Sequence, residues 1–280
     1  MSANASRLAR NFHTTFKPER QYINALLRFA AAGKAGDSQS IAAETGIPTG
    51  KSSGKVPAIV DYCRGMGLIS LVGAPRSAVK RFELTPFGRV VFFEDPYLKL
   101  PITQWLAHFQ LCSPLHGAEV WYQTFFPGKQ RLGMTFTRTQ LENYLGQMLD
   151  CPASGIIGPM VGMYEDNAAF GACGALSENG DVITRQPTPI RDEFGYGLGA
   201  WLLRLIELHF PKNEQLSVVE LDQEAGWKSI PGWDADETLR VLALIEQKGL
   251  IGVDRHMQPW LIHPKKSADA AWKMIYDDMI

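Results

Sequence analysis

Apolar residues between Gln21 and Arg89 recur first with the period of helices and then with that of strands. Ile23, Leu26 and Leu27 form one helical face, and Gly46 is a helix-stop signal. The elements expected here are helices over 21–32, 38–46 and from 54 onward, followed by strands over 68–72 and 79–84. Three helices followed by a strand pair predict a winged helix-turn-helix.

The rest of the chain gives a helical pattern and then a second copy of the first one. The region 97–197 is predicted to be mostly helical, with a short hairpin over 174–186 that turns at 178–181. Beyond it we expect helices over 200–209, 222–227 and 234–248, extended chain over 217–221, and strands over 250–254 and 259–262. The predicted fold class is therefore mainly α with small β wings, in which two winged helix-turn-helix domains flank a helical middle region. The expected domains are an N-terminal arm (1–20), a basic winged helix-turn-helix (21–96), the helical middle domain (97–197), an acidic winged-helix-like domain (198–264) and a C-terminal helix (265–280).

The overall composition is that of an ordinary globular protein. The chain has a net charge of −1, and 45% of its residues are hydrophobic. No apolar run approaches the roughly 20 residues of a membrane-spanning helix. The first ten residues are not followed by the apolar segment of a secretory signal. The 4 cysteines form no C-x-x-C pair, which predicts reduced thiols and no zinc site. We expect a cytoplasmic protein without a membrane partner.

Positive charge is concentrated in the first predicted winged helix. Between positions 51 and 89, 7 basic residues stand against only Asp61 and Glu83. Such a local excess is expected of a surface that neutralises phosphates, so the predicted partner is double-stranded DNA. The candidate DNA-binding residues are Lys51, Ser52, Ser53, Lys55, Arg64, Lys80 and Arg81.

The second predicted winged helix has the opposite charge. Between Glu214 and Lys248, 8 acidic residues outnumber 3 basic ones. An acidic surface repels phosphates, so this domain is expected either to dock on a protein or to serve only in packing.

The turn before the third helix contains Gly50, Lys51 and Ser52, which invites comparison with a nucleotide-binding loop. Only three residues separate Gly46 from Gly50, whereas a Walker A loop has four, and the segment joins two helices. The turn is better interpreted as the entry to a recognition helix whose backbone amides face a phosphate, and an ordinary inter-helix loop is the alternative.

Candidate catalytic residues flank the basic region: His13, Arg20, Glu94 and Asp95. Glu94 and Asp95 could hold Mg²⁺ or Mn²⁺, with His13 as acid or base and Arg20 stabilising developing charge. The alternative is that Asp95 caps the helix that follows Pro96 and that His13 orients the arm. Two other carboxylate pairs, 165–166 and 192–193, have no spacing that indicates a nuclease.

An aromatic group in the middle region has two interpretations. Its members are Trp105, His108, Trp121, Tyr122, Phe125 and Phe126. They are expected to form a helical core, and stacking of an unpaired base is the alternative.

Several of these segments together resemble a prokaryotic family whose best understood branch is the SspB-type DNA nickases of DNA phosphorothioation, an antiphage modification system. The matching segments are 12–16 (Phe-His-Thr-Thr-Phe), 50–56 with 62–69, 84–88, 94–97, 105–108 and, loosely, 229–232.

The resemblance implies a DNA-nicking endonuclease that supports single-strand phosphorothioate modification. It also implies sulfur-transfer partners: a cysteine desulfurase, an ATPase and a protein like phosphoadenosine-phosphosulfate (PAPS) reductase. The alternative is a non-catalytic winged-helix adaptor or regulator that positions those partners on DNA. The family pattern does not identify catalytic residues.

Overall fold

The computed structural model describes residues 7–50, 54–73, 77–256 and 258–279. The chain forms two compact units, Met1–Gln186 and Pro187–Ile280. The division into five domains expected from the sequence stays a prediction, and its middle domain (97–197) extends past the boundary between these units. Among the described residues, no helix is both long and apolar enough to cross a membrane.

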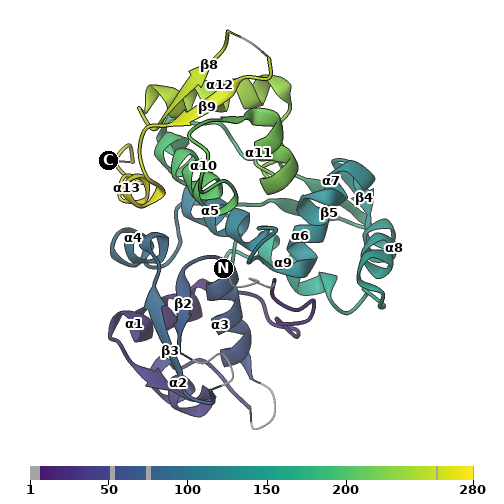
Figure 1. Cartoon of the computed structure of the whole chain (residues 1–280). Coiled ribbons are helices and arrows are strands. Elements are labelled where there is room, and N and C mark those ends of the chain that lie inside the picture. Colours follow the sequence, from purple (N-terminus) through teal and green to yellow (C-terminus); the bar gives the residue numbers. More distant parts are fainter. Residues whose placement is uncertain (1–6, 51–53, 74–76, 257, 280) are drawn as a thin grey trace. The chain divides into compact units, whose positions relative to one another are not determined.

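The first unit opens with a group of short helices and a small sheet, here called the N-terminal module (residues 20–94; Figure 1). Its sheet is antiparallel with strand order β1-β3-β2, and Ile69 of β2 lies opposite Leu84 of β3. Its elements are α1 (Arg20–Ala31), β1 (Ala35–Gly36), α2 (Ser38–Thr45), α3 (Lys55–Gly65), β2 (Ile69–Val72), β3 (Lys80–Leu84) and α4 (Pro86–Glu94).

Local sequence signals explain most boundaries of this module. The Asp37 side chain accepts a hydrogen bond from the Ser40 amide and so caps α2, and left-handed Gly46 ends the same helix. Thr85 caps α4 by accepting from the Gly88 amide. A Cβ atom at Gly88 would lie 1.8 Å from the Leu68 carbonyl oxygen, so only glycine permits this contact. The predicted helices and both predicted strands of this region are confirmed, and the pairing of β1 with β3 was not predicted.

The remainder of the first unit packs helices around a second small antiparallel sheet, of order β4-β6-β5. The predicted hairpin is confirmed as β5 and β6, but the third strand, β4, makes this region less purely helical than expected. The capping box of Thr137 with Gln140 starts α8. The elements are α5 (Pro101–Leu111), α6 (Glu119–Phe125), α7 (Pro127–Leu132), β4 (Thr135–Thr137), α8 (Arg138–Leu149), α9 (Ile157–Glu165), β5 (Leu176–Asn179) and β6 (Val182–Arg185).

The aromatic group of this region belongs mainly to the core. Trp105, His108 and Trp121 are almost fully buried, and Phe125 is 4% exposed. The core interpretation therefore holds for these residues, and none of them offers a ring face to an unpaired base.

The second unit combines helices with a third small antiparallel sheet, whose strand order is β7-β9-β8. Extended chain was expected over 217–221, but α11 begins at Val218 because the Ser217 side chain forms a capping box with Glu220. The helix expected over 265–280 is shorter, since α13 ends at Trp272. The elements are η1 (Asp192–Phe194), α10 (Gly195–His209), β7 (Leu216–Ser217), α11 (Val218–Ala225), α12 (Ala235–Gln247), β8 (Ile251–Asp254), β9 (Leu261–Pro264) and α13 (Ala268–Trp272).

The second unit repeats the order of elements in the N-terminal module. Helix, short strand, two helices, hairpin and final helix follow one another in both, and the strand orders β1-β3-β2 and β7-β9-β8 correspond. The turn from the third helix into the hairpin has the sequence Gly-Leu-Ile in each copy, at 67–69 and 249–251, and both glycines have positive φ. The copies differ in charge: residues 1–186 hold 18 basic and 14 acidic residues, whereas 187–280 hold 10 and 15.

Candidate nucleic-acid interface

Three arginines of the N-terminal module lie on its surface, one each on α3, β3 and α4. They are Arg64, Arg81 and Arg89, and all are exposed. Arg64 forms an ion pair with Asp61, with 2.7 Å between nitrogen and oxygen. Lys80 lies next to Arg81 on β3 and is partly exposed. Helix α3 and the β2–β3 hairpin thus carry four of the basic residues that the sequence assigned to DNA binding: Lys55, Arg64, Lys80 and Arg81.

Backbone hydrogen bonds join the two ends of the turn that leads into α3. Thr49 and Gly54 form a β-bridge, and the Lys55 amide donates to the Pro48 carbonyl at 3.2 Å. A Cβ atom at Gly54 would lie 1.9 Å from the Thr49 hydroxyl oxygen, so this close approach requires glycine. The candidates Lys51, Ser52 and Ser53 lie outside the described residues, and their phosphate-binding role stays a prediction.

Lys55 is bound within the protein, at the first position of α3. Its Nζ atom lies 2.5 Å from a Glu19 carboxylate oxygen, and the two side chains are only 15% and 26% exposed. The same ammonium group lies 4.7 Å from the centre of the Tyr22 ring. Lys55 therefore ties α3 to the segment before α1, which its position in the sequence did not reveal.

We expect Lys55→Met to lower the free energy of unfolding by about 1–2 kcal/mol, because it leaves a partly buried Glu19 carboxylate without its cation. Arg81→Ala, at an exposed position on β3, should leave stability within about 0.5 kcal/mol, as surface substitutions usually do. Urea unfolding of both variants checks this, and equal stabilities would contradict the internal role of Lys55. In DNA titrations, Arg81→Ala should reduce the salt dependence by more than Lys55→Met does.

The end of the arm and the start of α1 lie beside the segment that follows α4. Arg20 donates from Nη1 to the Tyr97 carbonyl oxygen at 3.0 Å, and from Nη2 to the Asn167 carbonyl oxygen. Asn24 donates to the Pro96 carbonyl oxygen at 2.8 Å. The Arg20 guanidinium therefore holds three chain segments together.

Asp95 caps the turn between α4 and α5. One carboxylate oxygen accepts the Lys99 amide at 2.8 Å, and the other accepts the Leu100 amide at 2.9 Å. The side chain is 5% exposed, whereas neighbouring Glu94 is exposed. Within the described part of the chain, no group of three or more His, Cys, Asp or Glu side chains could hold a metal ion.

His13 is buried in the aromatic core of the first unit. Its Nδ1 atom lies 3.0 Å from the Thr14 carbonyl oxygen, and its ring meets Phe12 and Trp121 edge-on. Burial lowers the pKa of His13 below its ordinary value of 6.5, and hydrogen bonds to backbone groups oppose that shift only in part. No described contact joins His13 to Glu94 or Asp95, so the four catalytic candidates divide into separate places.

Of the two other carboxylate pairs, the pair at 165–166 is occupied by structural contacts. Asp166 binds the Lys17 ammonium group and accepts the Ala168 amide, and the hydrogen bond from Lys17 is the largest cause of its lowered pKa. Glu165 accepts the Glu178 amide at 2.7 Å. Asp192 and Glu193 form the single turn η1.

A buried polar cluster in the first unit had no sequence signal beyond its aromatic composition. The Trp121 indole donates to the Tyr164 hydroxyl at 3.0 Å, and that hydroxyl shares a hydrogen bond with Nδ1 of His108 at 2.6 Å. Arg185, 5% exposed, donates from Nε to the Gly133 carbonyl, and its guanidinium lies 5.0 Å from the centre of the Phe136 ring. Burial lowers the pKa of Arg185 to about 10, so the residue remains a buried cation at neutral pH.

Protonation of His108 should make the protein acid-sensitive. Burial, together with the charge of Arg185, lowers the pKa of His108 to about 3. Between about pH 6.5 and about pH 3 the folded state therefore binds fewer protons than the unfolded state. In that window the free energy of unfolding should fall by about 1.4 kcal/mol for each unit by which the pH is lowered. Urea unfolding at about pH 7 and about pH 5 measures this, and His108→Asn, which keeps a polar partner for Tyr164, should reduce the loss by about 2 kcal/mol. An unchanged loss in the variant would exclude His108 as its source.

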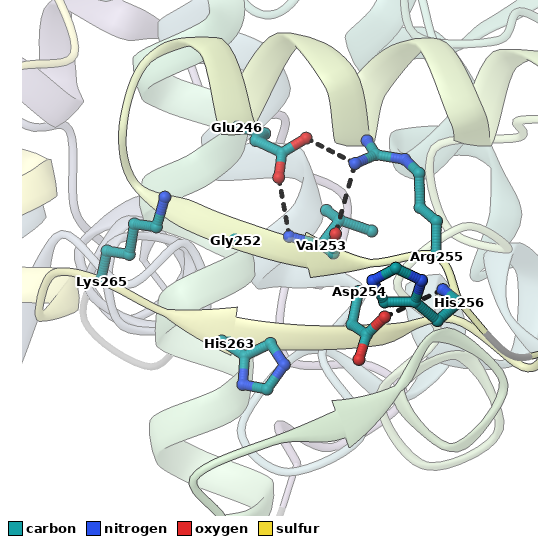
Figure 2. A pocket seen from close by; sticks show the side chains of 8 residues that line it. All are labelled: Glu246, Gly252, Val253, Asp254, Arg255, His256, His263 and Lys265. Atoms are coloured by element: carbon teal, nitrogen blue, oxygen red, sulfur yellow. Dashed lines mark hydrogen bonds and ion pairs between the residues drawn. The ribbon is translucent and has the colours of Figure 1, made fainter.

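The second unit has an open hollow of about 590 Å³ beside its hairpin. Figure 2 shows Glu246, near the end of α12, between the Val253 amide and the Arg255 guanidinium, each at 2.8 Å. Burial raises the pKa of Glu246, but these two partners outweigh it, and the pKa lies below its ordinary value. Asp254 accepts the His256 amide at 2.9 Å. The hollow is lined by Glu246, Gly252, Val253, Asp254, Arg255, His256, His263 and Lys265.

Residues 13–155, just over half of the chain, match a protein family described as "Protein of unknown function (DUF4007)". The chain belongs to this family. No curated protein matches the chain.

Two solved structures share the fold over nearly the whole chain. One, described as "SspB crystal structure", has a TM-score of 0.72 and 16% sequence identity, and the match covers 99% of this chain and 89% of that chain. The other, "Magnesium ion-bound SspB crystal structure", has a TM-score of 0.71 and 15% identity, with coverage of 96% and 87%. The fold of this chain is therefore similar to that of SspB.

Proposed function

We propose that this protein binds duplex DNA through its N-terminal module and serves a DNA phosphorothioation system. In this proposal the module is a winged helix-turn-helix, with α3 as the recognition helix and the β2–β3 hairpin as the wing. The observation that carries the proposal is the exposure of Arg64 and Arg81 on those two elements. A surface that neutralises phosphates places its cations on the elements that meet the DNA backbone.

The link to phosphorothioation rests on two supports. The segments quoted from the sequence resemble the SspB-type family, and the fold is similar to that of SspB. The proposed partners are the cysteine desulfurase, the ATPase and the PAPS-reductase-like protein of such systems. The acidic second unit suits a protein partner better than DNA, because its 15 acidic residues outnumber its 10 basic ones and the net negative charge repels phosphates.

Two roles fit this setting: a DNA nickase, and an adaptor that positions sulfur-transfer enzymes. The geometry of Asp95 favours the adaptor. Both of its oxygens are buried and bonded to backbone amides, so Asp95 serves the chain turn. His13 is likewise buried and packed between rings.

The proposed Mg²⁺ or Mn²⁺ is supported only by the magnesium-bound SspB structure. Glu94 and Asp95 do not fit such a site well. Mg²⁺ takes exposed carboxylates and retains several water molecules, whereas the Asp95 carboxylate is enclosed. A metal used by this protein would need other ligands.

A supercoiled-plasmid assay separates the two roles. The full chain is incubated with plasmid and Mg²⁺, Mn²⁺ or a chelator, and binding is followed in parallel by gel retardation. Retardation without open-circular product is the result expected of the adaptor. Metal-dependent open-circular product would instead establish the nickase, and an absence of retardation at physiological salt would contradict the proposed function as a whole.

A further inference from the structure

An aromatic ring lies on the surface of helix α4, where the fold does not require it. The side chain of Phe93 is 70% exposed, the largest exposure among the large hydrophobic residues described. Its ring meets that of Phe92 edge-on, with 5.2 Å between the ring centres. The two rings line an open hollow of about 500 Å³, together with Ala30, Ala31, Glu83, Leu84 and Arg89.

The packing of α4 depends on its other face. Phe87 and Val91 are buried, and Gly88 lies against the backbone of Leu68. Thr85 caps the helix and Pro86 occupies its first turn. The exposed ring therefore contributes little to folding, and its contact with water is unfavourable unless a ligand covers it.

The hollow is lined by one cation, Arg89, which suits a phosphate, and by one carboxylate, Glu83. Arg89 precedes Phe93 by four residues in α4, so the two side chains occupy the same face of the helix. Arg89 is exposed and lines the same hollow. A second exposed ring follows the helix: Tyr97 is 43% exposed, and the Lys99 ammonium lies 5.8 Å from the centre of that ring. Rings next to cations are typical of surfaces that bind unpaired bases and their phosphates.

We propose that the hollow beside α4 binds an unpaired base of single-stranded DNA, stacked on Phe93, with its phosphate at Arg89. This inference rests on the proposed function, since it assigns a second form of DNA to the same N-terminal module. Glu83, which also lines the hollow, supplies an acceptor for an exocyclic amino group of the base. Apolar side chains of a protein partner are the competing occupant, but they would not require the cations.

Fluorescence anisotropy with a labelled single strand and with a duplex of the same sequence tests the proposal in the full-length protein. Phe93→Ala should weaken single-strand binding by about 5- to 150-fold, the range for loss of one stacked base, and Phe93→Trp should preserve it. Arg89→Ala should weaken it less. Leu239→Ala, which removes a side chain that is 43% exposed on α12, is the matched control and should have no effect.

The outcomes separate the two proposals. Duplex binding should change by less than about twofold in Phe93→Ala, because phosphate contacts at α3 and the hairpin remain. Unchanged single-strand affinity in both Phe93→Ala and Arg89→Ala would overturn the stacking site and leave duplex binding intact. Failure of the wild-type protein to bind either form would overturn the proposed function and this inference together.

Discussion

Replacement of Lys51, Arg64 and Arg81 together by alanine should lower the affinity for duplex DNA on the order of 100-fold at about 0.15 M salt. Each phosphate contact releases about one condensed counterion, so the loss of three contacts should reduce the slope of log affinity against log salt by about three. Arg64 and Arg81 are exposed, and their removal opens no cavity. Titration of labelled duplex at several salt concentrations measures both quantities.

The matched control removes the same charge from the acidic unit. Arg191, Lys212 and Lys273 are all exposed there, and their replacement by alanine changes the net charge equally. If DNA attraction depended only on net charge, both triple variants would lose the same affinity. A salt slope that is unchanged in the first triple variant would place the DNA surface elsewhere on the molecule.

The second large effect is expected at Asp95. Asp95→Ala leaves two backbone amides, of Lys99 and Leu100, without an acceptor in a part-buried turn. Each unsatisfied buried donor costs about 1–3 kcal/mol, and because this turn is only part-buried the free energy of unfolding should fall by about 2–4 kcal/mol, the lower part of the range for two donors. Asp95→Asn keeps one acceptor oxygen and should lose about half as much. Urea unfolding at neutral pH gives these values.

Glu94→Ala is the control for Asp95, because Glu94 is exposed at the end of the same helix. Its stability should match the wild type within about 0.5 kcal/mol. Wild-type stability of the Asp95→Ala protein would show that Asp95 does not stabilise the turn as a cap. If that protein also lost a nicking activity that the wild type has, Asp95 would again be a candidate catalytic residue.

Elements with local signals could be predicted from the sequence. Asp37 and Asp234 each cap the helix that was expected after them, and Gly46 and Gly249 follow helices at the predicted places. The signals failed where they conflicted. Ser217 to Leu221 has the β-branched and apolar residues of a strand, but the capping box at Ser217 starts a helix after two residues of strand.

Pairing between distant segments was harder to predict. Strand β1 has two residues and β4 has three, too few to show a period, and each forms only because β3 or β6 offers an open edge.

In the candidate site, too, features of the local sequence could be predicted, whereas contacts between distant residues could not. The surplus of basic residues over 51–89 could be counted, and the structure exposes Arg64 and Arg81 as the count suggested. The partner of Lys55 could not be found in this way, because Glu19 lies 36 residues away. The exposure of Phe93 could not be predicted either, since it continues an apolar run, Val90 to Phe93, whose buried and exposed faces depend on how α4 packs.

The central claim is that duplex DNA binds to α3 and the β2–β3 hairpin of the N-terminal module. Amide hydrogen exchange of the full-length protein, followed by mass spectrometry with and without duplex DNA, tests it most directly. The expected result is DNA-dependent protection of peptides from 48–66 and 69–84, with no change over α11 and α12. Protection confined to the second unit, or no protection at saturating DNA, would contradict the claim.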